Sequence, residues 1–210
     1  MTRRVSGLLA ALLAALIACA AVPLLAQQQL TRAPEAGSAK GGFVEPAKPP
    51  SPSAVPSAAA APPTAAPAAP LSAETQDTLR RINAYRAAGA SCGQRRFEPA
   101  PPLAWSTKLE QAASAHARDM ANRRTMSHTG GDGSSMSDRV ARVGYHWGAL
   151  GENVSAGYRT VPDGLEGWMK SPGHCSNIMG AQFREVGVGA ANAPGDTYGW
   201  YRAMVLGTPR

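Results

Sequence analysis

The segment from Ser171 to Gly189 constrains the fold of this chain more than any other. It places a Pro-Gly turn, His174, Cys175 and Glu185 within nineteen residues. Glu185 opens the run Val-Gly-Val-Gly, whose alternation of β-branched residues and glycines indicates a strand packed closely against another element. We therefore expect the rest of the domain to bring its chemically active residues to this segment.

The N-terminal segment has the pattern of a bacterial export signal. Two arginines precede an apolar run over residues 8–21 that is too short to span a bilayer comfortably. Within this run, the tetrapeptide Leu-Ile-Ala-Cys ends at Cys19 in the form of a lipoprotein cleavage site, and ordinary signal cleavage after Ala20 or Ala26 is the alternative. We assign residues 1–26 to a signal peptide with Cys19 as the candidate lipidation site. The protein is then exported, to the periplasm, to the outer membrane through a lipid anchor, or to the medium.

Residues 27–71 have the composition of a tether. Ten of the eighteen prolines fall between Pro34 and Pro70, among Ala, Ser and Gly. Such a stretch buries too little apolar surface to fold, so we predict a disordered, extended linker. With a lipid on Cys19, it would hold the following domain away from a membrane. Residues 72–210 form that domain, which is long enough for its own core.

The charge of the chain gives a weak case for nucleic acid. The formal net charge is +7, but residues 72–210 carry 16 basic and 12 acidic side chains and therefore only +4. The arginines are scattered in pairs and are not interleaved with aromatic residues along a stripe, so we predict no nucleic-acid partner. A mildly positive surface suits anionic envelope polymers or lipid headgroups, and a simple solvated face explains it equally well.

The three cysteines favour one disulfide. If Cys19 carries a lipid or leaves with the signal peptide, Cys92 and Cys175 remain, and in an oxidising compartment they would bridge and close a loop of more than eighty residues. By loop entropy, such a bridge would stabilise the folded domain by about 4 kcal/mol. A Cys175–His174 nucleophile pair is the competing interpretation. It is disfavoured because neighbours in sequence rarely point at each other and no group that would activate the thiol is evident.

Hydrophobic spacing and capping residues predict helices first and strands near the end, which is an α+β pattern. The loops between them should carry Cys92–Pro102, Ser127–Thr129 and Gly151–Asn153, and Ser171–His174 should form a turn. The predicted helices run from Ser72 to Tyr85, from Ser106 to Met120, from Ser137 or Asp138 to Gly144 and around Leu165–Met169, and the predicted strands are Phe183–Ala190 and Tyr198–Leu206.

Four residues form a candidate site: His128, Glu152, His174 and Glu185. They lie 24, 22 and 11 residues apart, so only the fold can join them. Two imidazoles with one or two carboxylates suit a divalent ion such as zinc, or could position a water for general-base chemistry. Singly, each has a structural explanation: a turn, a loop cap or an ion pair. His116, on a helix among alanines, is expected to be a core residue and not a ligand.

The order of the motifs resembles a known family. AASAHARDMANRRTMSHTG, then GENV, GWMKSPGHCSNIM and FREVGVG, resemble the bacterial branch of the CAP superfamily. This group comprises the SCP-like extracellular proteins, related to cysteine-rich secretory proteins, antigen 5 and plant pathogenesis-related proteins. The resemblance covers Thr78 to Leu206. It implies a three-layer α–β–α sandwich with a cleft of two histidines and two acids, which in some members hold a divalent metal.

Carried over to this chain, the resemblance makes His128 the first histidine, Glu152 the first acid and His174 the second histidine. The second family acid often stands three residues after a helix tryptophan, where this chain has Ser171. Glu185 is the nearest candidate for that role. The last strand also departs from the family, because Arg202-Ala203-Met204-Val205 stands where members often show a Thr-Gln pair.

Three functions remain open from sequence. The first is a binding protein whose His/Glu cleft takes an envelope lipid, peptidoglycan or another protein. The second is a zinc-dependent hydrolase, with Glu152 or Glu185 activating water. The third is a structural envelope module. Zinc is preferred over calcium because the glycine-rich loop around Asp132 lacks the acidic residues of a calcium loop.

Overall fold

The computed structural model describes residues 43–46 and 70–210. The signal peptide and Cys19 lie outside these residues, and so does the tether except for Phe43–Pro46 and its last two residues. Within the described part, no helix is both long enough and apolar enough to cross a membrane.

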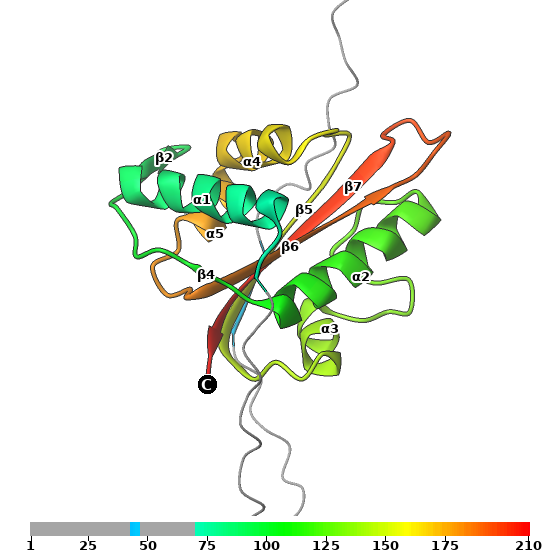
Figure 1. Ribbon diagram of the computed structural model, residues 1–210, viewed down its shortest axis with the longest axis horizontal. Helices are drawn as coiled ribbons and strands as arrows, with labels where there is room; N and C mark the ends of the chain where they lie inside the picture. The colour runs from blue at the N-terminus through cyan, green and yellow to red at the C-terminus, as the bar shows by residue number, and fades with distance from the viewer. Residues whose placement is uncertain (1–42, 47–69) are drawn as a thin grey trace, which may run out of the picture. The chain divides into compact units, whose positions relative to one another are not determined.

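A five-stranded sheet forms the centre of the domain (Figure 1). Its strands lie in the order β1-β5-β7-β6-β4, and all neighbours are antiparallel except β4 and β6, which are parallel. A separate two-stranded hairpin is made by β2 and β3. The strands are β1 (Phe43–Pro46), β2 (Ala90–Cys92), β3 (Arg95–Phe97), β4 (Ala104–Trp105), β5 (Trp147–Ala156), β6 (Glu185–Asn192) and β7 (Trp200–Pro209).

Five helices cover the sheet, and several begin at a side-chain cap. The Ser72 side chain accepts a hydrogen bond from the Thr75 backbone at the start of α1. Ser135 and Asp138 form a reciprocal capping box at the start of α3, which satisfies two backbone donors that the helix leaves unpaired. The helices are α1 (Ala73–Ala88), α2 (Thr107–Arg123), α3 (Met136–Arg142), α4 (Val161–Lys170) and α5 (Pro172–Ile178).

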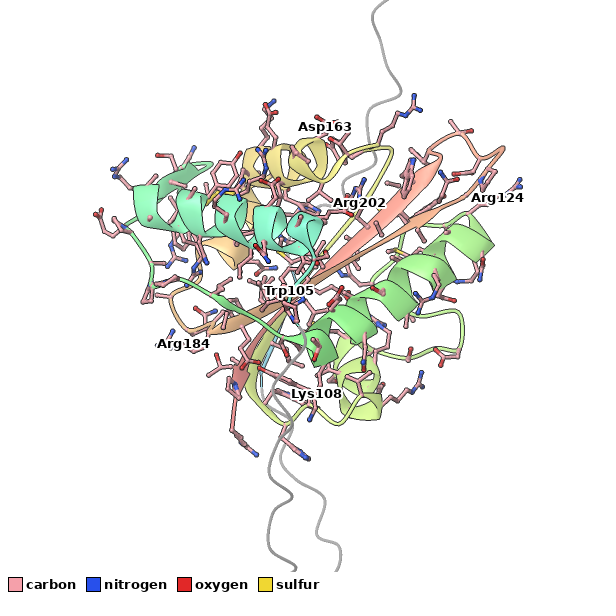
Figure 2. The ribbon with its side chains drawn as sticks, in the orientation of Figure 1. Trp105, Lys108, Arg124, Asp163, Arg184 and Arg202 are labelled. Atoms are coloured by element: carbon pink, nitrogen blue, oxygen red, sulfur yellow. A yellow bond between two sulfur atoms is a disulfide. The ribbon has the colours of Figure 1, made fainter. Side chains whose placement is uncertain are left out.

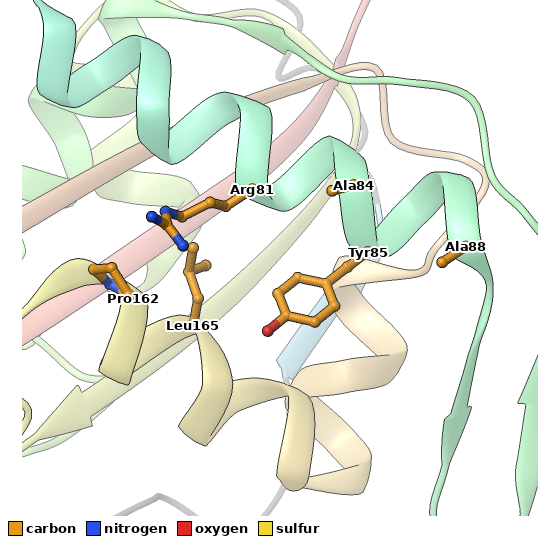
Figure 3. Close-up of a pocket in the computed structure, with 6 residues that line it drawn as sticks. All are labelled: Arg81, Ala84, Tyr85, Ala88, Pro162 and Leu165. Carbon is orange, nitrogen blue, oxygen red and sulfur yellow. The ribbon is translucent and has the colours of Figure 1, made fainter.

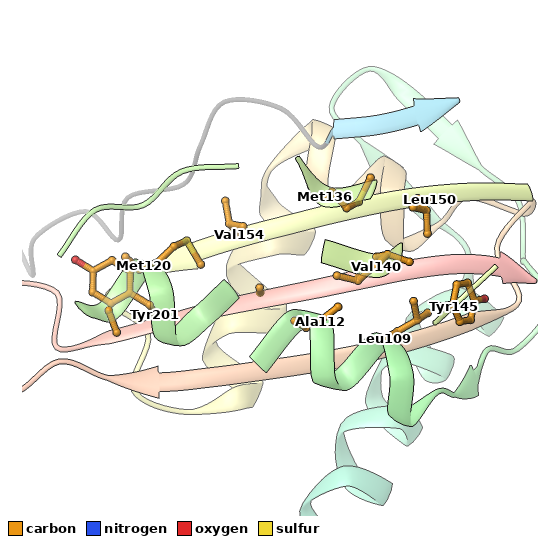
Figure 4. Packing of buried hydrophobic residues seen from close by; sticks show 14 of the residues in the cluster. Leu109, Ala112, Met120, Met136, Val140, Tyr145, Leu150, Val154 and Tyr201 are labelled. Atoms are coloured by element: carbon orange, nitrogen blue, oxygen red, sulfur yellow. The ribbon is translucent and has the colours of Figure 1, made fainter. Parts of the chain in front are cut away.

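The helices form two layers, one on each face of the sheet (Figure 1). Helices α2 and α3 bury one apolar cluster against the sheet, with Leu109, Met120 and Val140 facing Leu150 and Tyr201 (Figure 4). The opposite face holds a second cluster that includes residues of α1, α4 and α5. The predicted three-layer α–β–α sandwich is therefore confirmed.

Gly187 and Gly189 allow α2 to lie directly on β6. A Cβ atom on Gly187 would stand 2.0 Å from the Glu110 backbone nitrogen, and one on Gly189 would stand 2.3 Å from that of Ser114. No side chain fits there, so the Val-Gly-Val-Gly run is the sequence signature of this close contact.

The structure corrects four local predictions. Glu152 lies in the middle of β5 and not in a loop, because β5 pairs with β7 along nearly its whole length. The predicted Ser171–His174 turn is the start of α5, which Pro172 can occupy because it has no N–H to satisfy in the first helical turn. The predicted Cys92–Pro102 loop contains β3, and residues 43–46 of the predicted tether pair with β5 as β1.

Candidate functional site

Glu152 is a buried carboxylate in the middle of a strand. Leu150 and Val154, two residues to either side of it on β5, belong to the core beneath α2 and α3. Because side chains on a strand alternate between faces, Glu152 points into the same layer. Its side chain has no solvent exposure. A buried carboxylate is stable only with partners of opposite charge or with hydrogen-bond donors.

Two residues satisfy the Glu152 carboxylate. Its Oε1 lies 2.8 Å from Nδ1 of His128, and its Oε2 accepts a 2.6 Å bond from the Arg139 guanidinium on α3. Arg139 is itself buried and also donates to the Ser134 backbone carbonyl. Burial raises the pKa of Glu152, but the His128 hydrogen bond and the charges of Arg139 and His116 outweigh it, so the pKa lies below its usual value. Glu152 is therefore an ionised residue that orients His128.

His128 reaches Glu152 from the loop after α2. The buried His116 on α2 fixes this loop, since its Nε2 donates to the Ser127 backbone carbonyl at 2.8 Å. The expectation that His116 is a hydrogen-bonded core residue is confirmed. In contrast, 28% of the His128 side chain is exposed. The Glu152 contact holds Nδ1 and the Nε2 atom is buried, so a ligand would reach this ring through its exposed C–H surface.

His174 lies on α5, which packs against β5. The Asn153 amide donates to the His174 backbone carbonyl at 3.1 Å, and the Asn177 amide donates to the Glu152 carbonyl at 3.1 Å. These bonds attach α5 to the strand that carries Glu152. Burial, and then the charge of His128, lower the pKa of His174 to about 4, so the two imidazoles are close enough to interact.

Glu185 does not join this site. It opens β6, which β7 separates from β5, and it lies opposite Gly207 and Ala104 in the sheet. Burial and the neighbouring Glu185 charge raise the pKa of Tyr145, which places the carboxylate beside that ring. The structure therefore brings together His128, Glu152 and His174 and leaves Glu185 in a different hollow, lined also by Lys108.

The site has too few ligand side chains for a metal ion. Over residues 70–210, no three His, Cys, Asp or Glu side chains are grouped so that they could hold one. Zinc sites use three or four protein ligands, whereas this site offers two imidazoles and a carboxylate whose two oxygens are already bonded by His128 and Arg139. These residues do not make a complete zinc site.

The predicted disulfide between Cys92 and Cys175 is present, with the two Cα atoms 5.4 Å apart. It joins β2 to α5 next to His174, in a small apolar cluster with Met179. Because Cys175 is oxidised, a nucleophilic Cys175–His174 pair is excluded.

Sequence reasoning missed Arg139, Asn153 and Asn177. Arg139 follows the capping box of α3 and stands between the buried residues Met136 and Val140, so a cation on an apolar helix face was a usable signal. The two asparagines lie inside the quoted GENV and CSNIM motifs, yet only the fold reveals that the Asn177 amide donates to the Asn153 side-chain oxygen.

A second feature lies on the other face of the sheet, where α1 and α4 enclose an apolar groove of about 350 Å³ (Figure 3). Tyr85 and Leu165 face each other across it, and Arg81 lies at one end.

Comparison with known proteins places the domain in a family and agrees with its fold. The family model described as "CAP: Cysteine-rich secretory protein family" matches residues 79–206. The protein described as "Uncharacterized protein YkwD" of Bacillus subtilis (strain 168) is 28% identical over 127 residues, which cover 58% of this chain and 49% of that protein. The chain thus spans about half the length of this relative.

Two solved structures share the fold. One is an extracellular protein containing a SCP domain from Bacillus anthracis str. Ames, with a TM-score of 0.51 and 23% identity, covering 67% of this chain and 45% of that one. The other is an outer surface protein from Borrelia burgdorferi, with a TM-score of 0.55 and 15% identity, covering 65% of this chain and 93% of that one.

Proposed function

The chain belongs to the CAP family of cysteine-rich secretory proteins through residues 79–206, and from this premise we propose that it is an exported binding protein. Its ligand is an envelope or extracellular molecule that contacts His128 at the site formed with Glu152 and His174. The extracellular and outer-surface relatives support an exported location.

One observation carries this proposal: a fully buried carboxylate is used to hold a partly exposed imidazole. A buried ion pair adds little net stability, because desolvation offsets the attraction between the charges. Glu152 and Arg139 are nevertheless both buried, and together they fix the orientation of His128. Pre-orienting a side chain that contacts the ligand lowers the entropy lost on binding, which favours recognition.

The proposal has a direct binding test. The whole chain, carrying Cys19→Ser so that no lipid contributes, is mixed with anionic phospholipid vesicles, with neutral vesicles and with purified peptidoglycan, and the bound fraction is measured by sedimentation. We expect one of these to bind the protein and His128→Ala to reduce binding about tenfold, as when one oriented side-chain contact is lost.

The matched control is His146→Ala, which removes an exposed histidine elsewhere on the surface and should bind like the unmodified chain. If His128→Ala and His146→Ala bind equally well to every probe, the site is not the recognition site. The structural-module interpretation would then be preferred.

The domain organisation is part of the proposal: signal peptide over residues 1–26, tether over 27–71 and folded domain over 72–210. Lipidation of Cys19 would anchor the protein to a membrane through the tether. Labelling cells with a radioactive fatty acid tests this, because the label should appear on the chain and disappear in Cys19→Ser. Ordinary cleavage after Ala20 or Ala26 predicts no label on either protein.

A zinc-dependent hydrolase is the second candidate, and the proximity of His128 and His174 is the observation in its favour. Zinc that bound both imidazoles would raise the melting temperature at neutral pH, and the shift would shrink in acid as the imidazoles protonate. An unchanged melting temperature in excess zinc removes this candidate and leaves the binding proposal in place.

A further inference from the structure

A second groove follows the free edge of β6 between α1 and α2. Strand β4 pairs only with Glu185 and Val186, so β6 from Gly187 onward has no further strand partner on that edge among the described residues. Two adjoining hollows of about 400 and 350 Å³ open along this edge and share residues of α1, α4, β6 and β7. Together they have the size of a small-molecule binding site.

Two tryptophans give this groove an aromatic lining. Trp105 is half-buried and is fixed in place because its Nε1 donates to the Glu110 carboxylate at 2.8 Å. Trp200 is also half-buried, and the guanidinium carbon of Arg202 lies 5.4 Å from its ring centroid. Both rings line the larger hollow, and Trp200 lines the smaller one as well.

Arg202 places a buried polar group between the two hollows. It is 3% exposed, and one of its terminal nitrogens donates to the Arg159 carbonyl at 2.7 Å. Its Nε is buried without a hydrogen-bond partner in the described part of the chain. Figure 2 shows Arg202 and Trp105 between α1 and α2. The Nε atom lies beside Gly164 of α4, so Arg202 is a candidate ligand contact because its side chain lines both hollows.

The charges around the groove argue for a neutral ligand. The carboxylates of Glu74 and Glu110 line the larger hollow together with Arg202. The smaller hollow adds one charge of each sign, Asp77 and Arg159. The lining is therefore mixed in charge and complements neither an anion nor a cation along its length. Thr75 and Ser114 add hydroxyls to the same wall. Hydroxyl-rich ligands satisfy donors and acceptors at once without carrying charge.

We propose that this groove binds a neutral oligosaccharide. The apolar C–H faces of successive sugar rings pack on Trp105 and Trp200, and their hydroxyl groups bond to Arg202 and to the Glu74 carboxylate. The groove is separate from the His128 site. Arg202 lies opposite Ser155 of β5, on the face covered by α1 and α4, whereas Glu152 points into the other layer.

The test uses tetra-acetylchitotetraose and maltotetraose as neutral probes and a heparin-derived tetrasaccharide as the anionic probe, with the whole chain. Calorimetry measures affinity, and the tryptophan indole signals in nuclear magnetic resonance spectra report the location. At least one neutral probe should bind saturably and shift the Trp200 indole. Trp200→Ala should weaken it about tenfold, as expected for loss of one aromatic face, and Glu74→Gln should weaken it severalfold.

Two controls keep the result specific. Glu166→Gln alters an exposed acid of α4 outside the groove and should not change affinity, and His128→Ala should also leave it unchanged. Absence of binding by both neutral probes, tighter binding of the anionic probe, or equal affinity of Trp200→Ala and the unmodified chain would each overturn the proposal. None of these outcomes bears on the His128 site.

Discussion

His128 is bonded to Glu152 by a 2.8 Å contact between Nδ1 and Oε1, and the two residues meet from a loop and from the middle of a strand. The other Glu152 oxygen accepts from Arg139, and the carboxylate is fully buried, so it is shielded from direct contact with a ligand. Glu152 therefore acts through His128 as a positioning residue. In this arrangement His128 contacts the ligand, whereas Glu152 and Arg139 hold His128 in position.

Replacing Arg139 should destabilise the domain, because it leaves the buried Glu152 carboxylate without its counter-charge. We expect Arg139→Met to lower the free energy of unfolding by about 3 kcal/mol, because Glu152 loses its buried counter-charge. Arg142→Met on the same helix is the matched control. Its partner Asp132 and Arg142 itself are both more than half exposed, so less than about 1 kcal/mol should be lost. Equal losses in urea unfolding of the two variants would contradict this assignment.

His174 should make the domain less stable in acid. Its folded pKa of about 4 lies below the usual 6.5, so between these values the unfolded chain binds more protons. The free energy of unfolding is unaffected above pH 6.5, falls as the pH drops toward 4, and loses at most about 3 kcal/mol from this residue.

His174→Gln should flatten that part of the stability profile, and His146→Gln, at an exposed site, should not. The measurement is urea unfolding at several pH values from 7 to 4. A profile for His174→Gln that runs parallel to that of the unmodified chain would rule out a depressed pKa. Comparison between variants is needed because carboxylates of the unfolded chain also begin to bind protons at the lower end of this range.

The sequence predicted the fold well where local chemistry dictates it. Ser72 and Ser106 marked the starts of α1 and α2, and the glycines of β6 indicated a close contact that proved to be with α2. It failed for β5, since Gly-Glu-Asn looks like a loop and becomes a strand only because β7 and the core lie beside it. Distant pairing overrides local preference there.

The site could be predicted only in part for a related reason. The motifs supplied His128, Glu152 and His174, but nothing local distinguishes Glu185, two strands away, from an acid that points into the cleft. Arg139 was missed because its partner lies on another element, and a salt bridge between remote elements leaves no spacing to recognise. Pairings of this kind become visible only in the folded chain.

Gly189 should tolerate no side chain. Gly189→Ala would place a Cβ atom 2.3 Å from the α2 backbone, which cannot move away without separating the helix from the sheet. We expect a loss of about 3 kcal/mol or failure to fold. Gly148→Ala on β5 is the control, because its nearest neighbour would be 3.8 Å away, and its stability should change by less than about 0.5 kcal/mol. If Gly189→Ala unfolds at the same melting temperature as the unmodified chain, the close contact between β6 and α2 is refuted.

The Cys92–Cys175 bridge should contribute much of the stability of the domain. It joins residues 83 positions apart, so its loss releases the unfolded chain from a large loop, which corresponds to about 4 to 5 kcal/mol of loop entropy. Cys92→Ala with Cys175→Ala should lower the free energy of unfolding by up to this amount, measured in guanidinium chloride without reductant. The unmodified chain under reducing conditions should show a similar loss. Because the bridge holds α5 beside β5, the double variant should also shift the His174 ring resonances, whereas a loss below about 1 kcal/mol with unshifted resonances would show that α5 is held by its asparagine bonds alone.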